Sequence, residues 1–308
     1  MKIRESEKNN CKDLNLYFKV IRITVLLITI LCFYSCSSSS SDSSSDSNMN
    51  KVMKTSPLKS TFQYDLNNPD EKYNLLNSLT EISGLAYYKE EIILCIQDEK
   101  ATIYCLDLVK NEIVSKYKFG QDGDFEDIAV VDTIAYLIRS DGHIFEIKNF
   151  DKEDFEITDH NTPLSAKNDI EGVTYDKSLN SLLLACKGSP GINKENRHNG
   201  YKAVYAFSLE NMKLMKEPAF LISRKNLDSF QPSGLAINPV SDEIFVISSA
   251  GKILIVLGRN GNIQGIHKLD PDLFRQPEGI CFSPSGDLYI SNEGSEGEGN
   301  ILKFKLHK

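Results

Sequence analysis

The sequence has 308 residues, of which 25% are charged and 9% aromatic, and its formal net charge is −8. This length allows two average domains, although a repeated all-β fold often uses as many residues for a single one. An acidic globule has no electrostatic reason to bind nucleic acid, so we exclude that class of partner; it could hold a cation.

The chain begins with an expected export signal. Residues 1–22 are polar and basic, and residues 23–34 form an apolar run too short to span a bilayer comfortably. Ser35 directly before Cys36 resembles the lipobox of bacterial lipoproteins, which implies a signal peptide over residues 1–35 and lipidation of Cys36. Phe33 departs from the usual Leu, a departure that the looser lipoboxes of Bacteroidetes-type bacteria accept. The alternative is an uncleaved signal anchor in which Cys36 is an ordinary residue.

Residues 36–59 are expected to be a flexible tether. They begin with a Ser/Asp tract that cannot build a core and would act as a solvated spacer. The lipid would hold the protein at a bacterial membrane, so we expect it in the cell envelope, with the periplasmic and outer faces both open. Residues 60–308 then form the folded domain, which we expect to be a monomer.

The folded part contains five copies of one sequence unit. Each copy starts with an opening residue, Glu or Ser, followed by Gly and an apolar strand, with Asp in place of Gly in the second copy. The Gly positions are Gly84, Asp127, Gly172, Gly234 and Gly279, spaced 43, 45, 62 and 45 residues apart. Strand-only repeats of this length predict a five-bladed β-propeller. A six-bladed propeller is the alternative, if a blade is hidden in the widest interval.

The remaining elements follow in chain order. Residues 61–66 alternate between apolar and polar and precede the first copy, so we predict that they form the strand that completes the last blade. Blade one is predicted to have strands at 83–88, 92–97, 102–108 and 113–118. Asp-Gly at 141–142 and Asn-Gly at 260–261 predict tight hairpins in blades two and four. A disulfide between Cys95 and Cys105, which flank one hairpin, is left open.

Blade three carries an insertion at residues 188–200. A loop this long in a compact fold is more often functional than decorative, so we expect it to have a role beside the channel. Blade five begins at residue 276 and ends with a strand at 301–306.

These repeats and the leader together resemble the SdiA-regulated family of bacterial propellers, which is distantly related to NHL-repeat proteins. The similarity is carried by the five openings, by Ser291-Asn292-Glu293-Gly294 at the exit of the last blade, and by the leader; it covers roughly residues 60–308. The resemblance implies a five-bladed propeller with a calcium site, in a family whose biochemical activity is not established.

Acidic residues recur where the blades open. Glu126, Glu171 and Glu278 are opening residues, Ser83 and Ser233 fill the other two positions, and pseudo-symmetry should bring the acids to one mouth of the channel. Converging carboxylates repel unless a cation lies between them, and all-oxygen ligands favour Ca²⁺. We predict Glu126, Glu171 and Glu278 as metal ligands, with Glu81, Asp127 and Glu293 next. The alternative is that these acids cap backbone amides or pair with Lys187 and Arg139.

Two classes of function remain open. The first is a binding or scaffold module for a small-molecule or protein ligand. The second is a metal-dependent hydrolase of a lactone or phosphoester, in which Glu81 or Glu293 acts as the base. Whether the protein is an enzyme is therefore undecided, and we name no catalytic residue for the first class.

Overall fold

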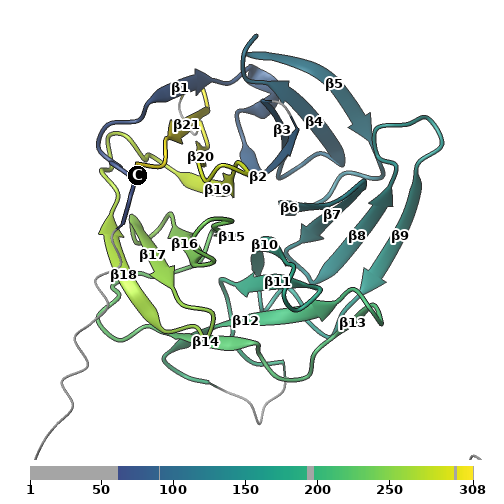
Figure 1. Ribbon diagram of the computed structural model, residues 1–308. Coiled ribbons are helices and arrows are strands. Elements are labelled where there is room, and N and C mark those ends of the chain that lie inside the picture. The colour runs from purple at the N-terminus through teal and green to yellow at the C-terminus, as the bar shows by residue number, and fades with distance from the viewer. Residues whose placement is uncertain (1–61, 90, 193–197, 295–296, 308) are drawn as a thin grey trace, which may run out of the picture. The chain divides into compact units, whose positions relative to one another are not determined.

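Five small antiparallel sheets surround a central axis (Figure 1). The computed structural model describes residues 62–89, 91–192, 198–294 and 297–307, so the predicted signal peptide, Cys36 and the tether lie outside the described residues. All five sheets and all five core clusters of the described residues belong to the compact unit Leu58–Lys308. The five-bladed propeller is confirmed, and no sixth blade occurs in the described ranges.

Each blade is one sheet whose first strand lies nearest the axis. Blade one consists of β2 (Ile82–Lys89), β3 (Ile92–Gln97), β4 (Thr102–Asp107) and β5 (Glu112–Lys118). Blade two consists of β6 (Phe125–Val131), β7 (Ile134–Arg139), β8 (His143–Lys148) and β9 (Glu156–Asn161). Blade three consists of β10 (Ile170–Asp176), β11 (Ser181–Cys186) and β12 (Tyr201–Ser208), with β13 (Lys213–Leu214) and β14 (Phe220–Ser223) both paired to β12.

The last two blades complete the ring. Blade four consists of β15 (Gly234–Ile237), β16 (Ile244–Ser248), β17 (Ile253–Leu257) and β18 (Ile263–Lys268). Blade five consists of β19 (Pro277–Phe282), β20 (Leu288–Asn292), β21 (Asn300–Phe304) and β1 (Glu71–Asn74). The only helical segment among the described residues is a single 3-10 turn, η1 (Asn77–Leu79), and none of them forms a helix long and apolar enough to cross a membrane.

The core lies between the blades. Middle strands such as β11 are buried along their whole length, whereas the rim strand β5 alternates between exposed and half-buried residues. Five apolar clusters fill the five interfaces between neighbouring sheets, so the packing continues around the whole ring. This arrangement fixes where each first strand, and therefore each opening residue, stands relative to the axis.

An N-terminal strand closes the ring, as predicted, but the predicted residues were wrong. The strand that pairs with β21 is β1, with Glu71 opposite Lys303 and Tyr73 opposite Ile301. The Lys303 ammonium lies 3.2 Å from the Glu71 carboxylate across this pair. Residues 62–66 form no strand in the structure.

The alternation in residues 62–66 serves packing instead of strand pairing. Phe62, Tyr64 and Leu66 pack against the core cluster shared by blades four and five. The Tyr64 hydroxyl donates a hydrogen bond to the Gly286 carbonyl oxygen at 2.6 Å, and it accepts one from the Asn238 side chain at 2.8 Å. A two-residue period therefore indicated burial of one face, but it could not tell a paired strand from an extended segment that lies over a seam.

The four cysteines within the described ranges, Cys95, Cys105, Cys186 and Cys281, are free. Cys95 in β3 is paired with Tyr104 in β4, while Cys105 is paired with Leu94, so the two cysteines are offset by one residue. Because successive side chains of a strand point to opposite faces, Cys95 and Cys105 lie in two different core clusters. No disulfide joins them.

Both predicted tight turns are present. Gly142 has φ +94° between β7 and β8, and Gly261 has φ +78° between β17 and β18, which glycine adopts without steric cost. In the insertion of blade three, residues 193–197 lie outside the described residues. Its first part is held by Asn168, whose side-chain amide donates to the carbonyl oxygens of Ser189 and Gly191.

Candidate functional site

The opening residues of the repeats are set at irregularities in the first strands. The pairing register shifts at Ser83 in β2, Glu126 in β6, Glu171 in β10 and Glu278 in β19. A β-bulge places an extra residue on one strand and re-aims its side chain. The sequence repeat therefore has a local structural purpose, which is to direct four opening side chains away from the sheet.

The acids meet around one cavity of about 310 Å³, which we call the acidic mouth. Glu81, Glu126, Glu171, Glu278 and Glu293, all predicted site residues, line it together. The other lining residues are Ser83, Asp98, Asp124, Asp169, Lys187, Ser233 and Gln276. Eight carboxylates thus share one cavity with one lysine, which is the only basic residue among the described residues of its wall.

Two serines orient the glutamates of the next blade. Ser83 donates through its Oγ to the carbonyl oxygen of Phe125 at 2.9 Å, one residue before Glu126. Ser233 donates in the same way to the carbonyl oxygen of Pro277 at 2.8 Å, one residue before Glu278. Ser83 and Ser233, the two opening residues that are not acidic, therefore each bind the backbone beside the opening glutamate of the next blade.

A second layer of lining residues lies two positions before the openings. The backbone carbonyl oxygens of Glu81, Asp124, Asp169 and Gln276 accept the amide protons of Asp98, Ser140, Lys187 and Glu293, respectively, at 2.7–3.3 Å. In blades one, two, three and five, these bonds join the segment that enters the blade to the end of its second strand. Sequence reasoning found Glu81 at this offset but missed Asp124, Asp169 and Gln276, although the same offset in the other repeats would have found them.

Lys187 is the internal cation of the acidic mouth. Its ammonium lies 2.8 Å from the Glu171 carboxylate. Burial raises the pKa of Glu171 to about 7, although Lys187 acts in the opposite direction. The predicted alternative of an acid paired with Lys187 is therefore present at one of the three central glutamates.

The other two central glutamates have no such partner. Burial, followed by repulsion from Glu171, raises the pKa of Glu126 to about 10 and that of Glu278 to about 7. Glu126 and Glu278 therefore hold their protons to higher pH than an exposed glutamate does.

The pKa values of two acids at the rim of the mouth are raised as well. Burial raises the pKa values of Asp98 and Glu293, and the nearby Glu81 adds to both shifts. The side-chain amide of Gln276 donates to the Glu293 carboxylate. One buried oxygen of Asp98, Oδ1, has no hydrogen-bond partner among the residues that the structure describes.

Asp127 is not part of the mouth. It is 1% exposed, and its two carboxylate oxygens accept the backbone amides of Ile128 and Val173, each at 2.8 Å. Burial raises its pKa well above the ordinary value. Asp127 stands where the other blades have Gly, and it joins blades two and three inside the wall, so its carboxylate is not free to act as the predicted ligand.

Asp141 lies outside the cavity wall because its carboxylate forms a bidentate pair with Arg139, at 2.8 Å on both sides. Among the described residues, no three His, Cys, Asp or Glu side chains stand close enough to form a ready-made metal site. The carboxylates converge on one cavity but do not stand in a coordination sphere.

The fold and the ring of openings define the class of this protein, an all-β propeller with an acidic channel mouth. The SdiA-regulated family model matches residues 58–296, and the chain belongs to this family. No curated protein matches the sequence.

Solved structures show likeness in fold alone. A glutaminyl cyclase from Myxococcus xanthus matches at 12% identity with a TM-score of 0.54, covering 78% of this chain and 96% of the other. A virginiamycin B lyase from Staphylococcus aureus matches at 15% identity with a TM-score of 0.43, covering 76% and 73% of the two chains.

Proposed function

We propose that the protein is a binding propeller that takes a calcium ion at its acidic mouth and presents the loaded mouth to a small-molecule or protein ligand. The observation that carries the proposal is the convergence of eight carboxylates on one cavity with a single lysine. One ammonium cannot balance that charge. The pKa values of Glu126 and Glu278 are raised, first by burial and then by repulsion from Glu171. A bound cation would remove the repulsion without protonation.

The chemistry of the donors favours calcium. The wall of the mouth offers carboxylate, hydroxyl and amide oxygens and no His or Cys. Hard oxygen ligands suit Ca²⁺, which tolerates irregular geometry from separate elements better than Mg²⁺ does. Glu126, Glu171 and Glu278 would hold the ion, with Glu81, Glu293 and the unpartnered oxygen of Asp98 beside them. Glu171 would have to exchange its Lys187 partner for the ion.

Calorimetry on residues 58–308 tests the calcium proposal. We expect saturable Ca²⁺ binding that Glu126→Gln/Glu171→Gln/Glu278→Gln weakens by at least about a hundredfold, because three ligand charges are lost. The matched control is Glu112→Gln/Glu156→Gln/Glu210→Gln, which removes the same charge from exposed positions. A folded wild-type protein that does not bind Ca²⁺, or equal loss in the control, would refute the site.

A metal-dependent hydrolase is the second candidate. It is favoured by Glu126 and Glu171, two buried glutamates of one cavity whose pKa values are both raised, first by burial and at Glu126 also by repulsion from Glu171. A bound cation would polarise a lactone carbonyl or a phosphoester oxygen. Glu81 or Glu293 would then accept the proton of the attacking water. Turnover of lactones or phosphoesters only with Ca²⁺ present, and none by the triple Gln variant, would establish it.

We also propose export and lipid anchoring through Cys36. The leader supports this, because a basic segment, an apolar run, Ser35-Cys36 and a Ser/Asp tract follow one another. In a bacterial host, wild-type protein should incorporate labelled fatty acid and sediment with membranes, while Cys36→Ala should lose the label. Equal sedimentation and no label in both proteins would instead indicate the uncleaved signal anchor.

A further inference from the structure

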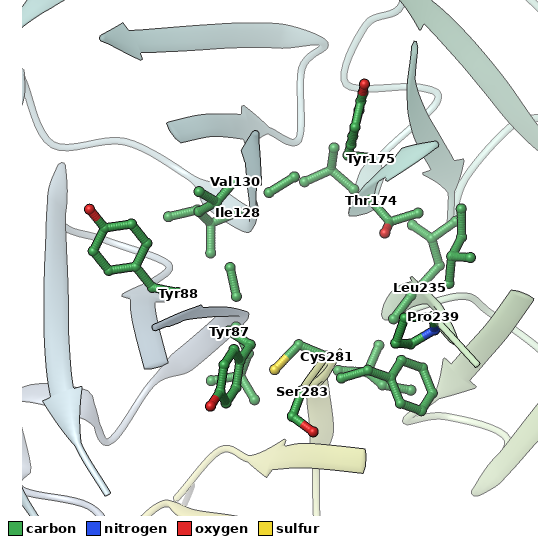
Figure 2. Close-up of a pocket in the computed structure, with 18 of the residues that line it drawn as sticks. Tyr87, Tyr88, Ile128, Val130, Thr174, Tyr175, Leu235, Pro239, Cys281 and Ser283 are labelled. Carbon is green, nitrogen blue, oxygen red and sulfur yellow. The ribbon is translucent and has the colours of Figure 1, made fainter. Parts of the chain in front are cut away.

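A second cavity lies at the opposite end of the axis from the acidic mouth. The starts of the first strands line the mouth, whereas the residues that follow in the same strands line a cavity of about 380 Å³. We call this cavity the apolar chamber; Figure 2 shows its side chains arranged around an open centre. Its walls are residues 85–88, 128–130, 173–175, 235–237 with Pro239, and 280–284, one group from each blade.

A ring of apolar residues lines the end of the chamber nearest the Gly positions. One residue of each first strand contributes to it, directly after the Gly position of the repeat, and all five are at most 3% exposed. The ring consists of Leu85, Ile128, Val173, Leu235 and Ile280. The two cavities share no described lining residue, so the two ends of the channel are different chemical environments.

Small residues keep the chamber open. The next position of each first strand is occupied by Ala86, Ala129, Thr174, Ala236 or Cys281, all of which line the cavity. Larger side chains at these five equivalent positions would narrow it, as the close packing of protein interiors leaves no other space for them. Repetition of small residues in all five blades, beside large ones on either side, makes the chamber a regular feature of the ring.

The chamber lacks charge. No residue of its described wall is acidic or basic, and aromatic residues stand at its edge. The hydroxyls of these rings are already engaged, since Tyr88 donates to Asp151 at 3.3 Å and Tyr175 donates to Asn180 at 3.1 Å. Thr174 and Ser283 add two aliphatic hydroxyls to the mainly apolar wall. Water held there by few polar partners is readily displaced by an apolar group.

We propose that the apolar chamber binds a small neutral molecule with a mainly apolar ring system. Its volume lies at the lower end of the range of small-molecule pockets, about 300–1,000 Å³, and its lining of apolar and aromatic side chains with a few hydroxyls is the usual composition of such sites. The absence of a counter-charge in the wall disfavours an ionised ligand, because its desolvation would not be repaid. The site is independent of calcium binding.

Two related fluorescent probes test the proposal on residues 58–308. N-phenyl-1-naphthylamine is neutral, and 1-anilinonaphthalene-8-sulfonate carries a sulfonate on nearly the same ring system. We expect saturable one-to-one binding of the neutral probe, at least about tenfold tighter than that of the anionic probe. No saturable binding of the neutral probe by folded protein, or equal affinity for both probes, would overturn the proposal.

A variant whose side chain fills the chamber gives a second test of the proposal. Thr174→Phe should place a ring in the cavity from a half-buried strand position and weaken binding of the neutral probe at least about tenfold. Thr158→Phe is the matched control, since Thr158 is exposed on the rim strand β9. If Thr174→Phe does not fold, the smaller change Ala236→Val serves in its place. Unchanged affinity in a folded chamber variant, or equal loss in Thr158→Phe, would place the probe elsewhere.

Discussion

The pKa of Glu126 depends on the burial and on the other charged groups of the acidic mouth. Its carboxyl is partly buried next to Glu171, which is itself paired with Lys187. Its raised pKa means that the folded protein binds protons that the unfolded chain would release. Protons and a divalent cation would therefore compete for the same oxygens, and the mouth is less stable when it holds neither.

This competition gives a pH dependence with a defined sign. Burial and repulsion raise the folded pKa of Glu126 to about 10 and that of Glu278 to about 7, above the ordinary 4.5. The stability that these two groups contribute is fully present below about pH 4.5 and is lost as the pH rises towards those values. Without calcium, Glu126→Gln/Glu278→Gln should unfold with a higher free energy than wild type at pH about 8, by on the order of 1–3 kcal/mol, and with a smaller difference at pH about 5.5.

Chemical denaturation of wild type and variant in chelator, at both pH values, measures this difference. Adding Ca²⁺ should reverse the order at pH about 8, because only wild type would gain binding energy. A variant that is less stable than wild type at both pH values in chelator would show that these glutamates stabilise the fold and would contradict the electrostatic account.

At the scale of elements, the ring depends on how its last sheet is completed. β21 would be an open edge without β1, and open edges favour aggregation. The segment at 62–66 contributes apolar packing over the seam between blades four and five, but no strand pairing. The two N-terminal segments therefore stabilise the fold in different ways.

Truncation separates these two contributions. A chain that begins at Asp70 should still fold as a monomer with a lowered melting temperature, because it loses Phe62, Tyr64 and Leu66 but keeps β1. A chain that begins at Leu76 should aggregate or unfold without a cooperative transition, because the edge of β21 is exposed. Thermal denaturation and size-exclusion chromatography distinguish the outcomes. If the chain that begins at Asp70 already aggregated like the chain that begins at Leu76, residues 61–66 would be the segment that closes the ring.

At the scale of the whole molecule, five copies of one short repeat form two chemically different ends of the channel. The opening residue of each copy forms the acidic mouth, the Gly position lets the first strands crowd together, and the next two positions form the apolar ring and the chamber wall. At Gly234, an added Cβ would stand 2.4 Å from the carbonyl oxygen of Glu278 in the next blade. In blade two, Asp127 stands at the Gly position, and its carboxylate accepts hydrogen bonds from the backbone amides of Ile128 and Val173.

Spacing along repeats that obey one symmetry predicted five blades, with six as the alternative, and it predicted the tight turns. The same spacing predicted the convergence of the acids Glu81, Glu126, Glu171, Glu278 and Glu293. Tertiary structure alone decided which segment closes the ring, that Cys95 and Cys105 face different interfaces, that Asp127 is held in the wall, and that Lys187 lies beside Glu171. These outcomes depend on register and on contacts between distant strands. Local periodicity cannot encode them, because it says which face is buried and not what lies opposite.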